Sequence, residues 1–320
     1  MLKKIFAFLL VCFSLGSIAA GSGFGQKIDK KRLNDRVRTV TIPISIFTKK
    51  EQKENRPEEF VQVGDLQVKE DNDDQVILSI RSVSNTPLAL AILIQDDLSS
   101  EANLKLGEIR KFIRNLPQGS RVMVAYLRTG TIQVRQKFTE DLEKAAKSLR
   151  IITGNPTAAP GSPYQQIEEA LNRFDALPNG RRAILLVSDG LDASRGIESS
   201  TPSQSLDLDR AILKAQRKSV AVYSFYSPAS LTGSGSSLLV LNGQGSLARL
   251  SDETGGRAFF QGSIAPISFE PFFTDLNRAL NRQFALTYLS THMKKGYHKL
   301  KVLSTNPEVE IEHPRGYYYK

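Results

Sequence analysis

The spacing of hydrophobic positions changes twice along the chain and divides it into three parts. Up to about residue 86, apolar residues alternate with polar ones, and this alternation returns after residue 282. A period of two is typical of half-buried β-strands. The predicted strands cover 37–47, 60–70 (in two pieces), 75–82, 284–290, 297–303 and 309–312.

The middle part, 87–282, alternates continuous apolar runs with helical stripes. Residues 88–94 are all apolar, as expected for a parallel strand covered on both faces. In 101–116, apolar residues recur every three or four positions, which predicts an amphipathic helix. The alternation continues through a Gly/Ser loop at 232–237 and a helix at 246–253 to a last helix at 271–282. The pattern therefore predicts a doubly wound α/β domain.

One connection in this domain is too short to cross over a sheet. The strand-like segments 121–127 and 131–138 are separated only by Arg128-Thr129-Gly130. A link of three residues joins antiparallel strands, because parallel neighbours need a dozen residues or more. Arg135 and Lys137 would suit an exposed edge. We therefore expect 131–138 to be an antiparallel edge strand.

The flanking β segments, 37–86 and 283–320, hold too few strands to form a stable sheet separately. We expect them to pair in one β-sandwich, with the α/β domain inserted between them in the chain. The predicted fold class is thus α/β with an added β-sandwich.

The first twenty residues have the pattern of a secretory signal. Lys3 and Lys4 precede the apolar run 5–13, and small residues follow up to Ala20. This order of charged, apolar and small residues is typical of a cleaved signal peptide. Residues 21–36 then form a predicted basic, flexible arm. We expect an exported protein, periplasmic or extracellular, with no transmembrane segment after cleavage.

Composition restricts the chemistry that is available. The one cysteine lies inside the predicted signal, so neither a disulfide nor a cysteine zinc cluster can form in the mature chain. Three histidines and no tryptophan are present. The formal charge of +10 is compatible with acidic partners but identifies none, and no nucleic-acid partner is predicted.

Polar clusters follow the predicted parallel strands, where open α/β sheets bind their ligands. Residues 95–100 follow the first apolar strand, Gly161-Ser162 precedes a predicted helix, and 188–192 follow the strand at 183–187. The clusters offer carboxylates and hydroxyls without histidine or cysteine. Such oxygen ligands are those that Mg²⁺ prefers.

Several phrases, in their order along the chain, resemble one known family. They are the short hairpin, Asp189-Gly190 after an apolar strand, the run 250–259 (LSDETGGRAF), 297–302 (YHKLKV) and 315–318 (RGYY). In this arrangement the chain resembles the von Willebrand factor A (VWA) family, and more closely its bacterial secreted, VWFA-related branch. The resemblance spans nearly the whole mature chain.

The resemblance implies a metal-ion-dependent adhesion site with an Asp-x-Ser-x-Ser loop, a threonine and a second aspartate. By position, these residues would be Asp96, Ser100, Ser162 and Asp189. Leu98 stands where the family has the middle serine. Sliding the loop by one residue gives Asp97 and Ser99, but then Glu101 replaces the last serine. Water can replace one neutral ligand of Mg²⁺, so either register allows a divalent cation.

Simpler roles exist for the same residues. Asp96 and Asp97 suit the start of a turn and a helix cap, and Ser162 before Pro163 is typical of an N-cap. The resemblance favours a secreted, non-enzymatic module whose protein partner supplies a carboxylate to the cation. The alternatives are a Mg²⁺-dependent phosphoryl-transfer enzyme using Asp96, Asp97 and Asp189, or a metal-free scaffold.

Overall fold

The computed structural model describes residues 37–48, 65–83, 86–128, 130–153, 161–177 and 180–319. The predicted signal peptide, the basic arm and the first of the two β pieces in 60–70 lie outside the described residues. Within the described part, no helix is long and apolar enough to cross a membrane.

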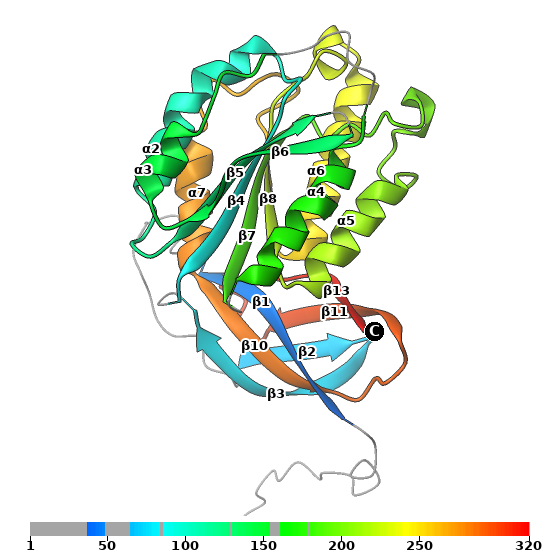
Figure 1. Cartoon of the computed structure of the whole chain (residues 1–320). Coiled ribbons are helices and arrows are strands. Elements are labelled where there is room, and N and C mark those ends of the chain that lie inside the picture. The colour runs from blue at the N-terminus through cyan, green and yellow to red at the C-terminus, as the bar shows by residue number, and fades with distance from the viewer. Residues whose placement is uncertain are drawn as a thin grey trace, which may run out of the picture. The chain divides into compact units, whose positions relative to one another are not determined.

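The centre of the chain forms a six-stranded sheet (Figure 1). All pairings are parallel except that of the edge strand β6, which runs antiparallel to β5 with Arg128 opposite Thr131. This confirms the prediction from the three-residue link. In spatial order the strands are β6 (Thr131–Thr139), β5 (Arg121–Arg128), β4 (Leu88–Gln95), β7 (Arg181–Ser188), β8 (Ala221–Tyr226) and β9 (Ala258–Phe259).

Helices cover both faces of this sheet, so the doubly wound architecture is confirmed. Successive residues of β4 point to opposite faces: Leu90 and Ile92 pack with one group of helices, and Ala91 with the other. This explains why the β4 sequence is apolar throughout. The first group is α2 (Leu106–Arg114), α3 (Leu142–Lys147) and α7 (Glu270–Asn281), and the second is α4 (Pro163–Asn172), α5 (Leu206–Arg217) and α6 (Ser237–Thr254). Short 3₁₀ segments are η3 (Ser100–Lys105), η4 (Arg173–Ala176), η5 (Ile197–Ser199) and η6 (Thr232–Ser234).

Helix α6 begins earlier than the sequence pattern indicates. Half of the predicted Gly/Ser loop is η6, and α6 starts at Ser237, nine residues before the predicted helix at 246. The Ser236 hydroxyl accepts a hydrogen bond from the Leu239 amide (3.5 Å) and caps the helix. Gly243 and Gly245 lie inside this helix, and because glycine is unfavourable in helix interiors, the sequence pattern does not predict the first half of the helix.

The flanking strands form a second, seven-stranded antiparallel sheet, which curls below the first in Figure 1. Strand β1 lies between two C-terminal strands, so the predicted pairing of the two chain ends is confirmed. The strands belong to one continuous sheet, and its curl brings Val302 of β11 to His313, just after β12 (N to Nε2, 3.2 Å). The order is β12 (Val309–Glu312), β1 (Arg38–Thr48), β10 (Gln283–Ser290), β3 (Asp73–Ser82), β2 (Leu66–Glu70), β11 (Gly296–Ser304) and β13 (Gly316–Tyr319).

Polar contacts fasten the curled sheet to the α/β domain. Arg257 donates to Glu312 (Nε to Oε1, 2.6 Å), and Arg315 donates to Asp252 (Nη2 to Oδ2, 2.8 Å). The Arg217 guanidinium of α5 lies 4.1 Å from the centre of the Tyr318 ring. These contacts leave the carboxyl edge of the six-stranded sheet, at the top of Figure 1, facing away from the curled sheet.

Candidate functional site

The most deeply placed carboxylate at the carboxyl edge belongs to Asp189, which follows β7 and is 2 % exposed. Its Oδ1 accepts from the Leu191 amide and its Oδ2 from the Thr232 hydroxyl, both at 3.1 Å. Burial and, to a smaller extent, the negative charge of Asp97 together raise its pKa from 3.8 to about 6. Asp189 and Asp97 are therefore neighbours at this edge, and their charges repel each other.

The ends of β4 and β7 are joined by a side-chain network. Gln95 Oε1 accepts from the Ser188 hydroxyl and from the Asp189 amide (3.2 Å). Ser188 Oγ in turn accepts from the Gly190 amide at 2.9 Å. Since all these atoms are buried, the network fixes the start of the Asp-Gly turn.

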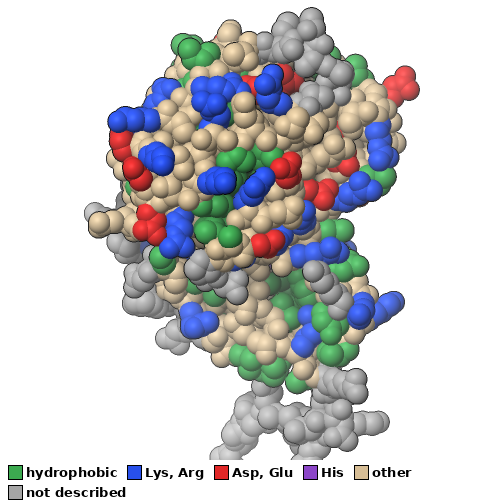
Figure 2. Space-filling view, in the orientation of Figure 1, with side chains coloured by type: hydrophobic (Ala, Val, Ile, Leu, Met, Phe, Trp, Pro, Cys, Tyr) green, Lys and Arg blue, Asp and Glu red, His purple; other side chains and the backbone are tan. Residues whose placement is uncertain are grey.

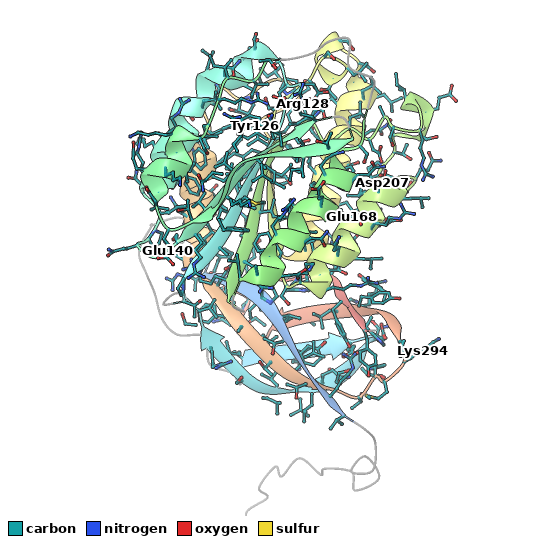
Figure 3. All side chains as sticks on the ribbon, in the orientation of Figure 1. Tyr126, Arg128, Glu140, Glu168, Asp207 and Lys294 are labelled. Carbon is teal, nitrogen blue, oxygen red and sulfur yellow. The ribbon has the colours of Figure 1, made fainter. Side chains whose placement is uncertain are left out.

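Asp96 does not share the neighbourhood of Asp189. Both of its carboxylate oxygens accept from the Arg150 guanidinium at 2.7 Å, and the Arg128 guanidinium lies 3.3 Å away. Arg150 also lies over the Tyr126 ring, 4.0 Å from its centre. Figure 3 shows Tyr126 and Arg128 at the same upper end of β5. In the first register of the family motif, the arginine therefore occupies the carboxylate oxygens of Asp96 that a cation would need.

The residues of the second register, Asp97 and Ser99, have different surroundings from Asp96. Asp97 is half-buried, and the loop that carries it is held against the segment after β8, with the Ser99 amide donating to the Pro228 carbonyl (2.9 Å). That segment leads into Thr232, the partner of Asp189. The buried Ser99 hydroxyl has no hydrogen-bond partner among the described residues. An unpaired buried hydroxyl has an unused lone pair, which suits a missing ligand.

Ser100 and Ser162 have other surroundings. Ser100 is exposed and begins η3. Ser162 Oγ accepts from the Tyr164 amide (3.3 Å), and Pro163 occupies the first helical position, so Ser162 is the N-cap of α4. The Tyr164 hydroxyl donates to the Gly190 carbonyl (2.6 Å), which ties this helix start to the Asp-Gly turn.

Helix α6 presses on the same turn through a glycine. A Cβ added at Gly243 would lie 2.1 Å from the Asp189 carbonyl oxygen. Gly190, with φ of +71°, faces Gly243 and Leu247 from the other side. The closeness of α6 to the turn therefore depends on the absence of a side chain at Gly243.

The donor types of the second register, two carboxylates and a hydroxyl, are those that a hard cation prefers. Asp97 and Asp189 provide two carboxylates, and Ser99 provides a free hydroxyl. Among the described residues, no group of three or more His, Cys, Asp or Glu side chains is placed to hold a metal ion. A cation here would depend on two charges with hydroxyl and water ligands, which is weak but sufficient chemistry for Mg²⁺.

The sequence analysis missed the roles of Arg150 and Thr232. Arg150 is 54 residues from Asp96 in sequence, and nothing in its local pattern distinguishes it from other basic residues. Thr232 lies at the start of the stretch that was predicted to be a Gly/Ser loop. Its position before a turn at a strand end is the only sequence feature that suggests a role.

The raised pKa of Asp189 predicts how stability depends on pH. The folded state holds its proton up to about pH 6, whereas the unfolded chain releases it near 3.8, so stability should fall as pH rises through this window. Asp189→Asn removes this dependence and, in EDTA, should be more stable than the wild type at pH 7 by about 3 kcal/mol. Urea unfolding between about pH 3.5 and 7.5 measures both curves. Parallel curves would contradict the assignment.

Comparisons with known proteins agree with this architecture only at low similarity. No family model matches the chain, and no curated protein matches it. Similar solved structures include an aerotolerance-related membrane protein from Bacteroides fragilis (14 % identity, 61 % of this chain and 98 % of that one, TM-score 0.42). Another is BatB from Bacteroides thetaiotaomicron, with 14 % identity over 60 % of this chain and 97 % of that one and a TM-score of 0.41. A third is the VWA domain of SpRpn10, with 14 % identity over 60 % of this chain and 94 % of that one and a TM-score of 0.38.

The fold of the α/β domain is therefore assigned from its own topology. The single antiparallel edge strand β6 and the helices on both faces of the sheet are those predicted from the sequence. The Asp-Gly turn lies at the carboxyl edge next to the first loop, as the resemblance also implies. The domain has a VWA-like fold.

Proposed function

We propose that this protein is an interaction module that binds a protein partner at the carboxyl edge of its six-stranded sheet. The observation that supports this most strongly is the position of its exposed apolar side chains. In the described part of the α/β domain, every exposed large hydrophobic residue lies in a segment at this edge. They are Leu104, Ile151, Ile197, Leu206, Leu238, Leu241, Phe260, Ile264 and Ile267.

These residues differ from scattered surface hydrophobics. Single exposed apolar side chains are normal on soluble proteins, but here nine come from five separate segments at one edge of the sheet. Leu238 and Leu241 are three residues apart on α6 and so share a helix face, and Ile267 is 85 % exposed. Exposed apolar side chains that gather at one edge of a protein are typical of a protein-binding surface. We call these nine residues the apolar rim.

The polar centre is the second register of the family motif. Asp97, Asp189 and the Ser99 hydroxyl would hold a divalent cation, and a cation bound there would offer a coordination position to a carboxylate of the partner. Thr232 holds Asp189 in place through its hydrogen bond. Asp96 is committed to Arg150, which disfavours the alternative of a three-aspartate phosphoryl-transfer site. The signal pattern at 1–20 supports a proposed interaction outside the cytoplasm.

Affinity capture with matched variants tests the proposal. Leu238→Ser/Leu241→Ser removes part of the apolar rim, and Val76→Ser/Leu78→Ser removes two exposed apolar residues from β3 of the curled sheet. Proteins captured by the wild type and by the β3 variant should be lost by the rim variant, by tenfold or more in quantitative mass spectrometry. If the rim variant captures the same proteins as the wild type, the carboxyl edge is not the binding surface.

A further inference from the structure

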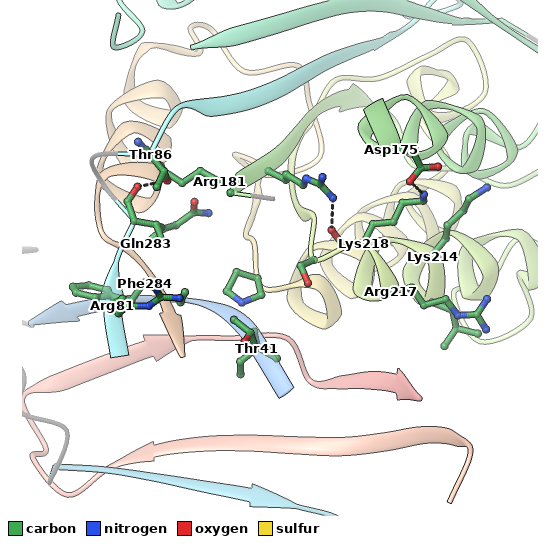
Figure 4. Close-up of a pocket in the computed structure, with 18 of the residues that line it drawn as sticks. Thr41, Arg81, Thr86, Asp175, Arg181, Lys214, Arg217, Lys218, Gln283 and Phe284 are labelled. Carbon is green, nitrogen blue, oxygen red and sulfur yellow. Dashed lines mark hydrogen bonds and ion pairs between the residues drawn. The ribbon is translucent and has the colours of Figure 1, made fainter. Parts of the chain in front are cut away.

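A basic groove lies at the other end of the six-stranded sheet, between the α/β domain and the curled sheet (Figure 4). Its volume is about 1190 Å³, and Gly180 and Arg181, at the amino end of β7, form part of its wall. It is therefore separate from the carboxyl edge. The lining includes Arg81, Arg181, Arg182, Arg210, Lys214, Arg217 and Lys218, against the acidic Glu168 and Asp175.

Neighbouring groups neutralise little of this charge. Asp175 is paired with Lys218, and Arg210 lies 3.5 Å from Asp207, which is outside the lining. The Arg217 guanidinium lies over the Tyr318 ring, a contact that keeps its charge. Figure 2 shows Lys and Arg side chains on both sides of the waist between the two sheets. When Asp207 is counted with the lining, a formal excess of four positive charges remains in the groove.

Part of this cluster has a structural explanation, because Lys214 and Arg217 lie in the last turn of α5, where cations favour the helix dipole. Arg81 does not, since it comes from β3 of the curled sheet. Arg181 and Arg182 are strand residues whose guanidiniums donate to the backbone carbonyls of Leu280 and Leu177 (2.5 and 2.6 Å). Arg81 of β3 and the cations of α5 therefore bring positive charge to the groove from two separate elements.

We propose that this groove binds an acidic polypeptide segment of a partner, as a second binding surface independent of the carboxyl edge. Its size exceeds that of a single phosphate ion, and its cations can attract several carboxylates of one acidic segment at once. Among the described residues that line the groove, Phe284 is the only aromatic one, so stacking of nucleic-acid bases has almost no platform there. The carboxylates of Glu168 and Asp175 would repel a continuous phosphate backbone, whereas a peptide can place neutral residues there. Asn172, Thr41 and Gln283 offer hydrogen bonds to a peptide backbone.

The test uses a fluorescent deca-glutamate peptide as probe and fluorescence anisotropy as readout. Arg81→Gln/Arg210→Gln/Lys214→Gln should weaken binding at least tenfold. Lys294→Gln/Lys295→Gln/Lys301→Gln removes the same charge from exposed positions of the curled sheet and should change binding less than twofold. Arg81→Lys/Arg210→Lys/Lys214→Arg keeps the charge and should retain binding. Raising NaCl from about 50 to about 200 mM should weaken binding by the wild type severalfold.

Four outcomes would overturn the proposal: no binding of the peptide at low salt, equal losses in the two glutamine variants, loss of binding in the charge-retaining variant, or tighter binding of a decanucleotide in the same groove. Melting curves establish that each variant is folded. Leu238→Ser/Leu241→Ser should leave peptide binding unchanged, so failure at the groove and failure at the carboxyl edge give different results.

Discussion

Gly243→Ala is expected to destabilise the protein by about 3 kcal/mol, although it adds a single methyl group. The new Cβ would lie 2.1 Å from the Asp189 carbonyl oxygen, a distance at which either α6 or the Asp-Gly turn must move. Hydrogen bonds with Gln95, Ser188 and Tyr164 fix the turn, so it cannot easily move away from the new methyl group. Chemical denaturation measures the loss, and the melting temperature should fall by roughly 5–10 °C.

Gly107→Ala is the matched control, because it makes the same change in another helix. A Cβ at Gly107 in α2 meets nothing within 4 Å, so this substitution should stabilise the protein by about 0.5 kcal/mol through helix propensity. Opposite signs at the two glycines would show that the contact with Asp189 is responsible. A neutral Gly243→Ala would mean that α6 does not press on the turn.

Arg150→Met is expected to cost about 3 kcal/mol, since it leaves the Asp96 carboxylate, 7 % exposed, without the partner of both its oxygens. The hydrogen bond to Gln133 (2.9 Å) and the contact with the Tyr126 ring would also be lost. Arg128 would remain near Asp96 and reduce the loss, because it is 3.3 Å away. Urea unfolding at pH 7 gives the value.

Two further variants separate the ion pair from packing. Arg150→Lys keeps one charge but cannot bond both oxygens, so its cost should lie between those of wild type and Arg150→Met. The double variant Asp96→Asn/Arg150→Met should be more stable than Arg150→Met alone, because the unpaired charge is gone. If the losses of stability in Asp96→Asn and in Arg150→Met add up to the loss in the double variant, Asp96 and Arg150 are not coupled. The arginine then does not block the first register.

The fold was predictable because its main features are local. The apolar runs of β4 and β7 and the three-residue link before β6 each require one arrangement of neighbouring strands. The pairing of the two chain ends followed from the shortage of strands in each flank. The continuous curl of the second sheet was not predictable, because the sequence gives no signal for the order in which seven short strands pair.

The site was predictable only in outline. The residue types and the sheet edge were apparent, but neither register of the first loop was complete, and the sequence favoured the one with Asp96 and Ser100. The choice between them depends on Arg150, whose contact with Asp96 is made through the tertiary fold. The importance of Gly243 was likewise hidden, since a glycine in that stretch suggested a loop rather than a close approach of helix and turn.

We propose that Asp97, Ser99 and Asp189 hold a cation at the carboxyl edge, while Asp96 is paired with Arg150. The most direct measurement is the melting curve in EDTA and in Mg²⁺, Mn²⁺ or Ca²⁺. A free cation concentration a hundredfold above Kd should stabilise the wild type by about 2.7 kcal/mol. Asp97→Asn and Asp189→Asn should abolish this response and Ser99→Ala should weaken it, while Ser100→Ala should leave it unchanged. Identical melts of wild type and Asp189→Asn across the series, or loss of the response in Ser100→Ala, would contradict the account.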